Sequence, residues 1–72
     1  MSKTIWTKEY AVFIKKLRQA RQDSGLKQIE VAKKLKRPQS YISRVESGVY
    51  RLDIIEVKQF ALIYGKNISE LI

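Results

Sequence analysis

Apolar side chains recur along this chain at the three- and four-residue spacing that places them on one side of an α-helix. The longest stripe comprises Tyr10, Phe13, Ile14 and Leu17. Later stripes predict further core positions at Val31, Ala32, Leu35, Ile42 and Val45, and then at Ile54, Val57, Phe60, Ala61 and Tyr64. No segment alternates apolar and polar residues for long enough to predict a strand. The pattern therefore predicts an all-α fold in which these stripes form the core.

Residues that start and stop helices agree with the stripes. A glycine follows each stripe, at Gly25, Gly48 and Gly65, and glycine readily adopts the left-handed conformation that ends many helices. Start signals precede three segments: Thr7 as an N-cap, and the capping-box pairs Asp53 with Glu56 and Asn67 with Glu70. We therefore predict five helices, over residues 8–24, 27–35, 38–47, 53–64 and 68–71.

Length and composition restrict the function to a few classes. A chain of 72 residues is expected to form one domain, over residues 1–72, with residues 1–6 as a loose arm. It contains no cysteine and no histidine, so we expect no metal site, no cofactor and no enzyme activity. It also lacks a glycine-rich phosphate loop, a secretory signal and an apolar run of the ~20 residues that span a bilayer. We expect a cytoplasmic protein with no membrane partner and no small-molecule ligand.

Positive charge is concentrated in the first two thirds of the chain. Of the 15 Lys and Arg residues, 13 lie in residues 1–52, where four acidic residues oppose them and the net charge is +9. Residues 53–72 have a net charge of −1, so the whole chain carries +8. A basic segment of this kind is typical of a surface that binds nucleic acid, although a merely solvated basic surface gives the same pattern.

The basic segment contains two short predicted helices joined by a tight turn, within residues 28–48. Ala32 provides the small side chain that two steeply crossing helices need where they touch. The outward positions of the second helix carry polar groups that can hydrogen-bond base edges in a DNA major groove, and these are Gln39, Ser40, Ser43 and Arg44. The pair of helices therefore indicates double-stranded DNA as the partner.

Short motifs, each of a different sequence, are spread over most of the chain. They are LRQAR (17–21), GLKQ (25–28), EVAKKL (30–35), PQSYIS (38–43), ESG (46–48), RLD (51–53) and ISELI (68–72). Together, over roughly residues 14–71, they resemble the Xre/Cro–C1 family, the small phage-repressor-like helix-turn-helix domains of bacteria and their phages. The resemblance implies a compact five-helix, lambda-repressor-like fold with the helix-turn-helix at the second and third helices. It also implies a transcriptional regulator, and we expect a repressor that binds a near-palindromic operator as a homodimer.

The resemblance assigns roles to particular residues. The base-reading positions are Gln39, Ser40, Ser43 and Arg44. Candidates for phosphate contacts are Lys27, Gln28, Arg37, Tyr41, Ser47, Tyr50 and Arg51, with packing as an equal alternative for Tyr41. Arg21 and Glu46 correspond to a family pair that forms a partly buried salt bridge between the first helix and the end of the third. That pair would fix the angle of the recognition helix.

Four residues in the motif depart from the family pattern. Lys36 stands where the turn usually has glycine, and a left-handed lysine costs of order 1 kcal/mol. Arg37 replaces a commonly apolar residue, Pro38 replaces a frequent Ser or Thr cap, and Lys27 replaces another common capping residue. These changes lower local stability and add positive charge beside the expected DNA face.

The fourth predicted helix has more apolar side chains than its core stripe requires. Ile55, Leu62 and Ile63 would point partly outward, where they could join Leu71 and Ile72 in a self-association patch. A homodimer formed through this patch would match the two-fold symmetry of a palindromic operator. The alternative is that these side chains complete the packing of a small core.

Other functions fit parts of the same pattern. A chain of this family could be the antitoxin of a toxin–antitoxin pair or the controller of a restriction–modification locus. A protein-interaction module that regulates another DNA-binding protein would use the apolar fourth helix. Nonspecific binding to the nucleoid or to RNA would depend on the net charge of +8 alone.

Overall fold

The computed structural model describes residues 7–72, and residues 1–6, the expected loose arm, lie outside the described residues. The described part contains five helices and no strand. Their bounds are α1 Lys8–Asp23, α2 Gln28–Leu35, α3 Gln39–Glu46, α4 Ile54–Tyr64 and α5 Ile68–Leu71. Each end lies within one residue of its predicted position, so the all-α, five-helix prediction is confirmed. None of these helices is long and apolar enough to cross a membrane.

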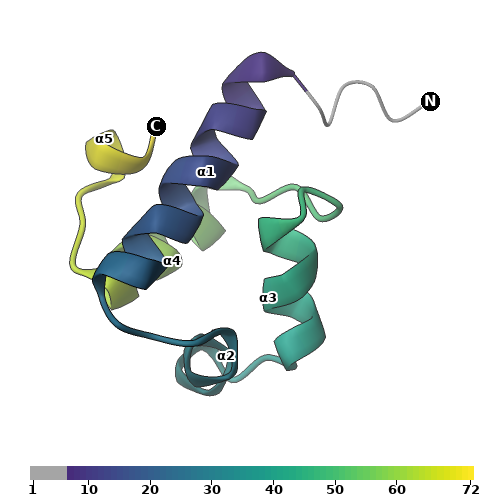
Figure 1. The fold of residues 1–72 in the computed structure, drawn as a ribbon, viewed down its shortest axis with the longest axis vertical. Coiled ribbons are helices and arrows are strands. Elements are labelled where there is room, and N and C mark those ends of the chain that lie inside the picture. Colours follow the sequence, from purple (N-terminus) through teal and green to yellow (C-terminus); the bar gives the residue numbers. More distant parts are fainter. Residues whose placement is uncertain (1–6) are drawn as a thin grey trace.

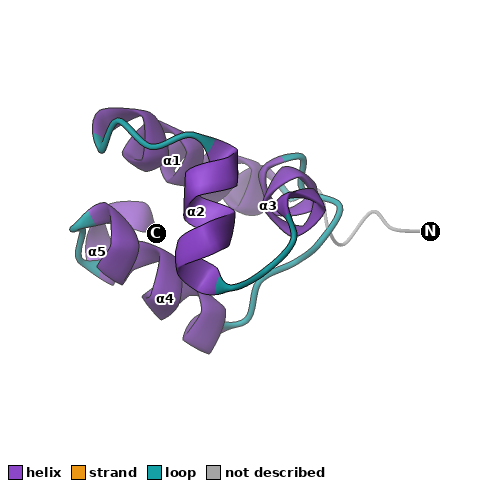
Figure 2. Ribbon diagram, turned by 90° about the horizontal axis from the view of Figure 1, so that it is seen from below, coloured by secondary structure: helices purple, strands orange, loops and turns teal. Residues whose placement is uncertain are grey.

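Helix α1 is the longest element and contacts α3, α4 and α5 (Figure 1). Helices α2 and α3 pack against each other, and α2 also contacts α4. Seen from below in Figure 2, α2 lies between α3 on one side and the α4–α5 pair on the other. Both views place α3 on the opposite side of the molecule from α5, so α3 has one face toward the bundle and one toward solvent.

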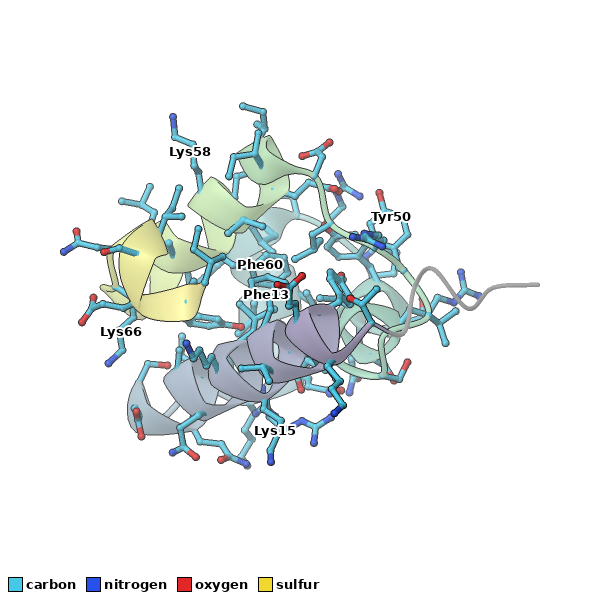
Figure 3. All side chains as sticks on the ribbon, turned by 90° about the horizontal axis from the view of Figure 1, so that it is seen from above. Phe13, Lys15, Tyr50, Lys58, Phe60 and Lys66 are labelled. Atoms are coloured by element: carbon cyan, nitrogen blue, oxygen red, sulfur yellow. The ribbon has the colours of Figure 1, made fainter. Side chains whose placement is uncertain are left out.

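Side chains from all five helices form the core. Figure 3 shows Phe13 and Phe60 between the helices, whereas Lys15, Lys58 and Lys66 point outward. The largest completely buried side chains are Phe60, Leu17, Ile42, Leu71, Val31 and Val45. The α1 stripe and the paired stripes of α2 and α3 thus face one shared interior, as predicted, except that Leu35 is only partly buried.

Two apolar predictions in the last part of the chain were wrong. Ile54, predicted in the core, is 57% exposed, because it lies in the first turn of α4, ahead of the part of the helix that packs against its neighbours. Glu56 is the buried side chain of this turn. Leu71, predicted in a surface patch, is 1% exposed, because α5 contacts both α1 and α4 and turns this side chain into the core. Ile63 is half-buried against the same core.

The predicted helix starts are formed by hydrogen bonds at the first turns. Thr7 Oγ1 accepts the Tyr10 N–H at 3.1 Å, which confirms the N-cap of α1. Asp53 and Glu56 form a reciprocal capping box at α4, with distances of 2.8 and 3.0 Å. A carboxylate also accepts the N-cap N–H at α2, Glu30 from Lys27, and at α5, Glu70 from Asn67, at 2.7 Å each. The N-terminus of α2 is therefore capped by the Glu30 carboxylate, although the side chain of the N-cap residue Lys27 has no acceptor group.

The turn between α2 and α3 has the expected left-handed residue at Lys36, with φ 58° and ψ 44°. After it, the Arg37 N–H donates to the Ala32 carbonyl at 3.0 Å, which closes the end of α2. Pro38 then serves as the N-cap of α3, in extended conformation. A lysine and a proline thus build a turn for which glycine and a hydroxyl residue are more usual.

Candidate nucleic-acid interface

The α2–α3 unit is held together by an apolar contact. Val31 and Ala32 of α2 and Ile42 and Val45 of α3 are all buried. Since Ala32 has only a methyl group, the two helices can approach closely where they cross. The buried sides of α2 and α3 thereby fix which side of α3 faces outward.

The outward side of α3 carries the four predicted base-reading residues. Gln39, Ser40, Ser43 and Arg44 are all exposed. They occupy two successive turns of the helix, where residues four apart lie one above the other. The structure therefore brings them together as one polar surface on the side of α3 away from Ile42.

The predicted phosphate-contacting residues lie around α3. Lys27 and Gln28 begin α2, Arg37 lies in the α2–α3 turn, and Ser47, Tyr50 and Arg51 follow α3. Lys27, Arg37, Ser47, Tyr50 and Arg51 are exposed, whereas Gln28 and Tyr41 are partly buried. The Ser47 hydroxyl donates to the Arg44 carbonyl at 3.1 Å, so its oxygen remains an acceptor. Cationic side chains thus stand at both ends of the polar surface of α3.

Glu46 joins three helices at the end of α3. Its carboxylate accepts two hydrogen bonds from Arg21 of α1, at 2.6 Å from Nε and 3.0 Å from Nη2. Gln28 of α2 donates its side-chain amide to the same carboxylate at 3.0 Å. Glu46 is only 2% exposed, so the expected pair is present as a buried ion pair with an additional amide donor. The amide of Gln28, for which a phosphate contact was predicted, therefore belongs to the scaffold.

Arg18 is a further residue of this cluster that the sequence analysis did not identify. Its Nη2 donates to the Glu46 carbonyl at 2.8 Å, so it caps the end of α3 from one helical turn before Arg21. Hydrogen bonding to Glu46 raises the pKa of the Arg21 guanidinium. In the sequence, the three-residue spacing of Arg18 and Arg21 indicates only that both lie on one basic side of α1.

A family model described as helix-turn-helix matches residues 17–71. This chain belongs to the Cro/C1-type helix-turn-helix family. Comparisons with curated proteins and with solved structures gave no significant match. Family membership supports a DNA-binding transcriptional regulator.

Two tyrosines, one on α3 and one in the loop after it, have their hydroxyl groups hydrogen-bonded within the protein. Tyr41 and Tyr50 each donate to Oε2 of Glu56 at 3.0 Å. Burial, followed by the hydrogen bond to Glu56, raises the pKa of Tyr41 above its ordinary value. The hydroxyl protons of both tyrosines are thus donated to Glu56, and the partly buried Tyr41 ring packs near Phe60, whereas its phosphate contact stays a prediction. Sequence reasoning assigned Glu56 only to a helix cap.

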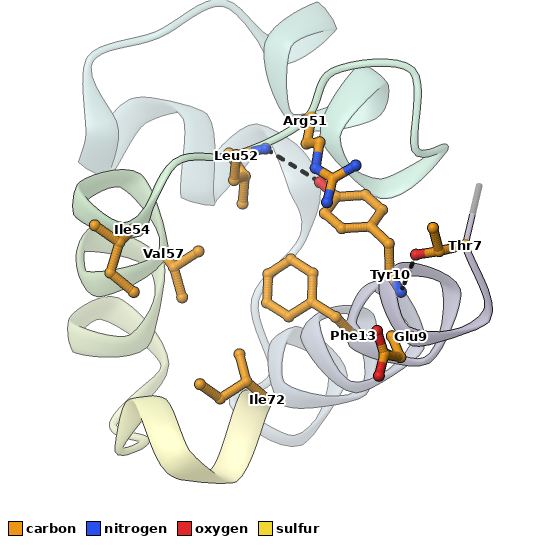
Figure 4. A pocket seen from close by; sticks show the side chains of 9 residues that line it. All are labelled: Thr7, Glu9, Tyr10, Phe13, Arg51, Leu52, Ile54, Val57 and Ile72. Atoms are coloured by element: carbon orange, nitrogen blue, oxygen red, sulfur yellow. Dashed lines mark hydrogen bonds between the residues drawn. The ribbon is translucent and has the colours of Figure 1, made fainter. Parts of the chain in front are cut away.

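Two arginines of this helix-turn-helix domain lie on aromatic rings. Arg37 Cζ is 4.4 Å from the centroid of Tyr41, and Arg51 Cζ is 4.9 Å from the centroid of Tyr10. The Tyr10 hydroxyl accepts the Leu52 N–H at 3.1 Å, which ties the loop after α3 to α1 (Figure 4). Stacking of this kind leaves the edge of a guanidinium able to donate to a phosphate.

An open groove of about 420 Å³ lies beside the first turns of α1 and α4. Figure 4 shows its mainly apolar lining, which includes Tyr10, Phe13, Val57 and Ile72. No cluster of acidic, histidine or cysteine side chains within residues 7–72 could hold a metal ion. The exposed polar side chains of α3 have Arg37 in the turn before them and Arg51 in the loop after them.

Proposed function

We propose that this protein is a sequence-specific repressor that inserts α3 into the major groove of double-stranded DNA. One observation carries the proposal: the four polar residues of α3 form a single exposed surface, with an exposed arginine in the turn before the helix and another in the loop after it. A major groove admits an α-helix, and the phosphates that border it lie where the loops would reach. Repression would follow because a protein bound at an overlapping operator excludes RNA polymerase.

The side chains of the α3 surface have the chemistry for base recognition. Gln39 lies in the first turn and can pair with adenine N6 and N7 through both ends of its amide. Arg44, one turn later, can donate to guanine O6 and N7. Ser40 and Ser43 can donate to or accept from several base edges, so they contribute less discrimination.

The flanking loops supply contacts that do not depend on sequence. Lys27, Arg37 and Arg51 would bind phosphates on the two sides of the groove, whereas the Ser47 hydroxyl proton is already donated to the Arg44 carbonyl. The N–H groups in the first turn of α2 also favour the binding of an anion, such as a phosphate, beside the same surface. This arrangement predicts a strong dependence of DNA affinity on salt concentration.

A homodimer is the assembly that best suits a near-palindromic operator. The exposed apolar side chains outside the DNA face include Ile54, Ile55, Leu62 and Ile72. Leu71 does not belong to the proposed patch because it is buried. Ile63 is half-buried, so only part of its side chain is available to the patch. The revised patch therefore lies on the outer side of α4 and at the end of α5.

Selection of bound duplexes from a random DNA library, at near-physiological salt, tests the proposal. We expect a near-palindromic consensus with two half-sites. Enrichment of a single half-site would retain sequence recognition and reject the dimer. No enriched motif would contradict the proposal and favour nonspecific binding or a protein-interaction module.

Variants of the α3 surface distinguish sequence-specific base contacts from nonspecific attraction between charges. Gln39→Ala should weaken binding to the selected duplex by about 1–3 kcal/mol, Ser40→Ala should weaken it by less, and both should leave binding to unrelated DNA unchanged. Lys27→Ala should weaken both duplexes alike and reduce the salt dependence. Equal losses on selected and unrelated DNA for all three variants would contradict sequence-specific reading.

A further inference from the structure

Side chains from three segments converge on the carboxylate of Glu56. Tyr41 comes from the recognition helix, Tyr50 from the loop that follows it, and Glu56 from the first turn of α4. Both hydroxyl groups donate to Oε2 at 3.0 Å, and the two tyrosine rings meet edge to face with centroids 5.3 Å apart. One oxygen atom thus links the recognition helix to the loop and to α4.

The Glu56 carboxylate cannot easily change its position. Its Oε1 accepts the Asp53 N–H at 3.0 Å, while its own N–H donates to Asp53 Oδ1 at 2.8 Å. Burial acts to raise the pKa of Glu56, but the hydrogen bonds from Asp53, Tyr50 and Tyr41 lower it overall, so the group is ionised at neutral pH. Oε1 serves the helix cap and Oε2 serves the two tyrosines.

A helix cap alone does not explain why a charged group is buried beside a DNA-binding surface. Glutamine can occupy the same position of a capping box without a charge. A carboxylate at 8% exposure loses most of its hydration, and it would also repel nearby phosphates. Its advantage over an amide is a second acceptor oxygen, because Oε2 accepts the two hydroxyl donors while Oε1 accepts the Asp53 N–H of the cap.

The cluster extends from Glu56 to a cation of the α2–α3 turn. The Tyr41 ring is stacked near Phe60 of the core, with centroids 6.2 Å apart, and the Arg37 guanidinium lies over Tyr41 at 4.4 Å. Arg37 is an exposed side chain with many rotamers, so a platform that restricts it reduces the entropy lost when it binds. Glu56 and Phe60 hold that platform in place.

We propose that Glu56 is a positioning residue for DNA binding, which acts through Tyr41 and Tyr50 to preorganise Arg37 for a backbone phosphate. The inference rests on the proposed function, because it assigns a target to Arg37. Glu56 does not itself touch DNA in this scheme. Its effect is transmitted by two hydroxyl groups and one aromatic ring.

The first test removes the two hydroxyl groups without changing the charge of the protein. Tyr41→Phe/Tyr50→Phe keeps both rings, and Tyr64→Phe is the matched control, because its hydroxyl is buried and has no hydrogen-bond partner within residues 7–72. The affinity of each variant for the selected duplex is measured over a series of salt concentrations. The double variant should bind about three- to fivefold more weakly, with a salt slope smaller by about one, while Tyr64→Phe binds like the wild type.

Coupling to Arg37 separates positioning from a general loss of structure. Arg37→Ala should weaken binding in the wild type but cause little further loss in the Tyr41→Phe/Tyr50→Phe background. A merely structural role predicts losses that add and a salt slope that does not change. Unfolding in urea, measured in parallel, ensures that every variant is folded under the binding conditions.

Variants of Glu56 give an independent measurement. Glu56→Ala should weaken specific binding although it removes a negative charge, and Glu56→Gln should recover part of the loss because its amide can donate to both hydroxyl oxygens. Glu70→Ala is the matched control, since Glu70 has the same capping contact, at 2.7 Å from the Asn67 N–H, on α5. Should Glu56→Ala fail to fold, the tyrosine variants decide the question alone.

Two results would overturn the inference. One is a folded Tyr41→Phe/Tyr50→Phe protein with the affinity and salt slope of Tyr64→Phe. The other is full additivity with Arg37→Ala. Failure of the proposed function looks different, because the wild type itself would then show no preference for any duplex before a variant is made.

Discussion

At the scale of single residues, Glu46 is a buried carboxylate whose hydrogen-bond partners come from two other helices. It receives donors from Arg21 of α1 and Gln28 of α2, and its carbonyl accepts from Arg18. A buried carboxylate is tolerated only when such donors replace its hydration. The cluster therefore ties the orientation of α3 to α1 and α2 through one side chain.

Replacing Glu46 should destabilise the protein and weaken DNA binding together. Glu46→Ala leaves the Arg21 guanidinium without its buried partner, and we expect a loss of about 3 kcal/mol in the free energy of unfolding, measured with urea. The exposed Glu9→Ala is the control and should change stability by less than about 0.5 kcal/mol. Unchanged stability and affinity in Glu46→Ala would reject the role of this ion pair.

The buried tyrosines predict loss of stability at alkaline pH. Burial raises the pKa of Tyr64 and of Tyr41 above the ordinary 10.0, so the folded state keeps protons that the unfolded state releases. The stability they confer is complete below pH 10.0 and declines as the pH rises above it. Thermal unfolding up to about pH 11 should show this decline, and Tyr64→Phe should make it less steep. An identical pH dependence in the variant would contradict the assignment.

At the scale of helices and turns, local chemistry sets where each element begins and ends. Reciprocal hydrogen bonds between Asp53 and Glu56 start α4, and left-handed residues end α2 at Lys36 and α4 at Gly65. The two left-handed positions have similar φ values, 58° and 67°, but only one is glycine. The α2–α3 turn therefore contains strain that the α4–α5 turn avoids.

Exchanging residue types at these two positions should have opposite effects. Lys36→Gly relieves the left-handed lysine and should raise the free energy of unfolding by up to about 1 kcal/mol. Gly65→Ala should lower it by about 1 kcal/mol, purely through backbone strain, because a Cβ there meets no atom within 4 Å. Urea unfolding of both variants checks the pair, and a loss of stability in Lys36→Gly would refute the argument for the turn.

At the scale of the whole molecule, the polar surface of α3 is separate from an exposed apolar surface on α4. Gln39 and Arg44 lie on α3, whereas Ile55 and Leu62 lie on α4, with Leu62 83% exposed. Val49, in the loop after α3, is a further exposed apolar residue. Helices α3 and α5 lie on opposite sides of the bundle, so a DNA surface and an apolar surface need not compete (Figures 1 and 2). This separation is what a DNA-binding dimer requires.

The dimer proposal predicts an effect of Leu62→Glu on assembly and none on folding. A charge at this exposed position should not disturb the core, but it should abolish two-fold assembly on the selected duplex. Sedimentation of the protein–DNA complex gives the number of copies bound. Val12→Glu, which places the same charge at an exposed position of α1, is the control and should retain the dimer. Two copies bound by Leu62→Glu would exclude this patch as the interface.

The sequence by itself determined the helices, their ends and the helix-turn-helix pattern. Stripes at helical spacing and capping pairs such as Asp53 with Glu56 act over three or four positions, so they can be identified without the fold, whereas Lys36 was placed in the turn by the family resemblance. The exposure of Gln39 and Arg44 followed in the same way, because Ile42 and Val45 occupy the other side of α3.

Only the tertiary structure decided which side chains meet across elements. Gln28 reaches Glu46 across 18 positions, and Tyr41 reaches Glu56 across 15, so neither contact has a local signal. For the same reason, Ile54 is exposed and Leu71 is buried, which is the reverse of the prediction. Burial at the end of a helix depends on which neighbouring helix covers it. Local periodicity is set by the backbone of one helix, whereas hydrogen-bond partners and burial are set by the packing of several.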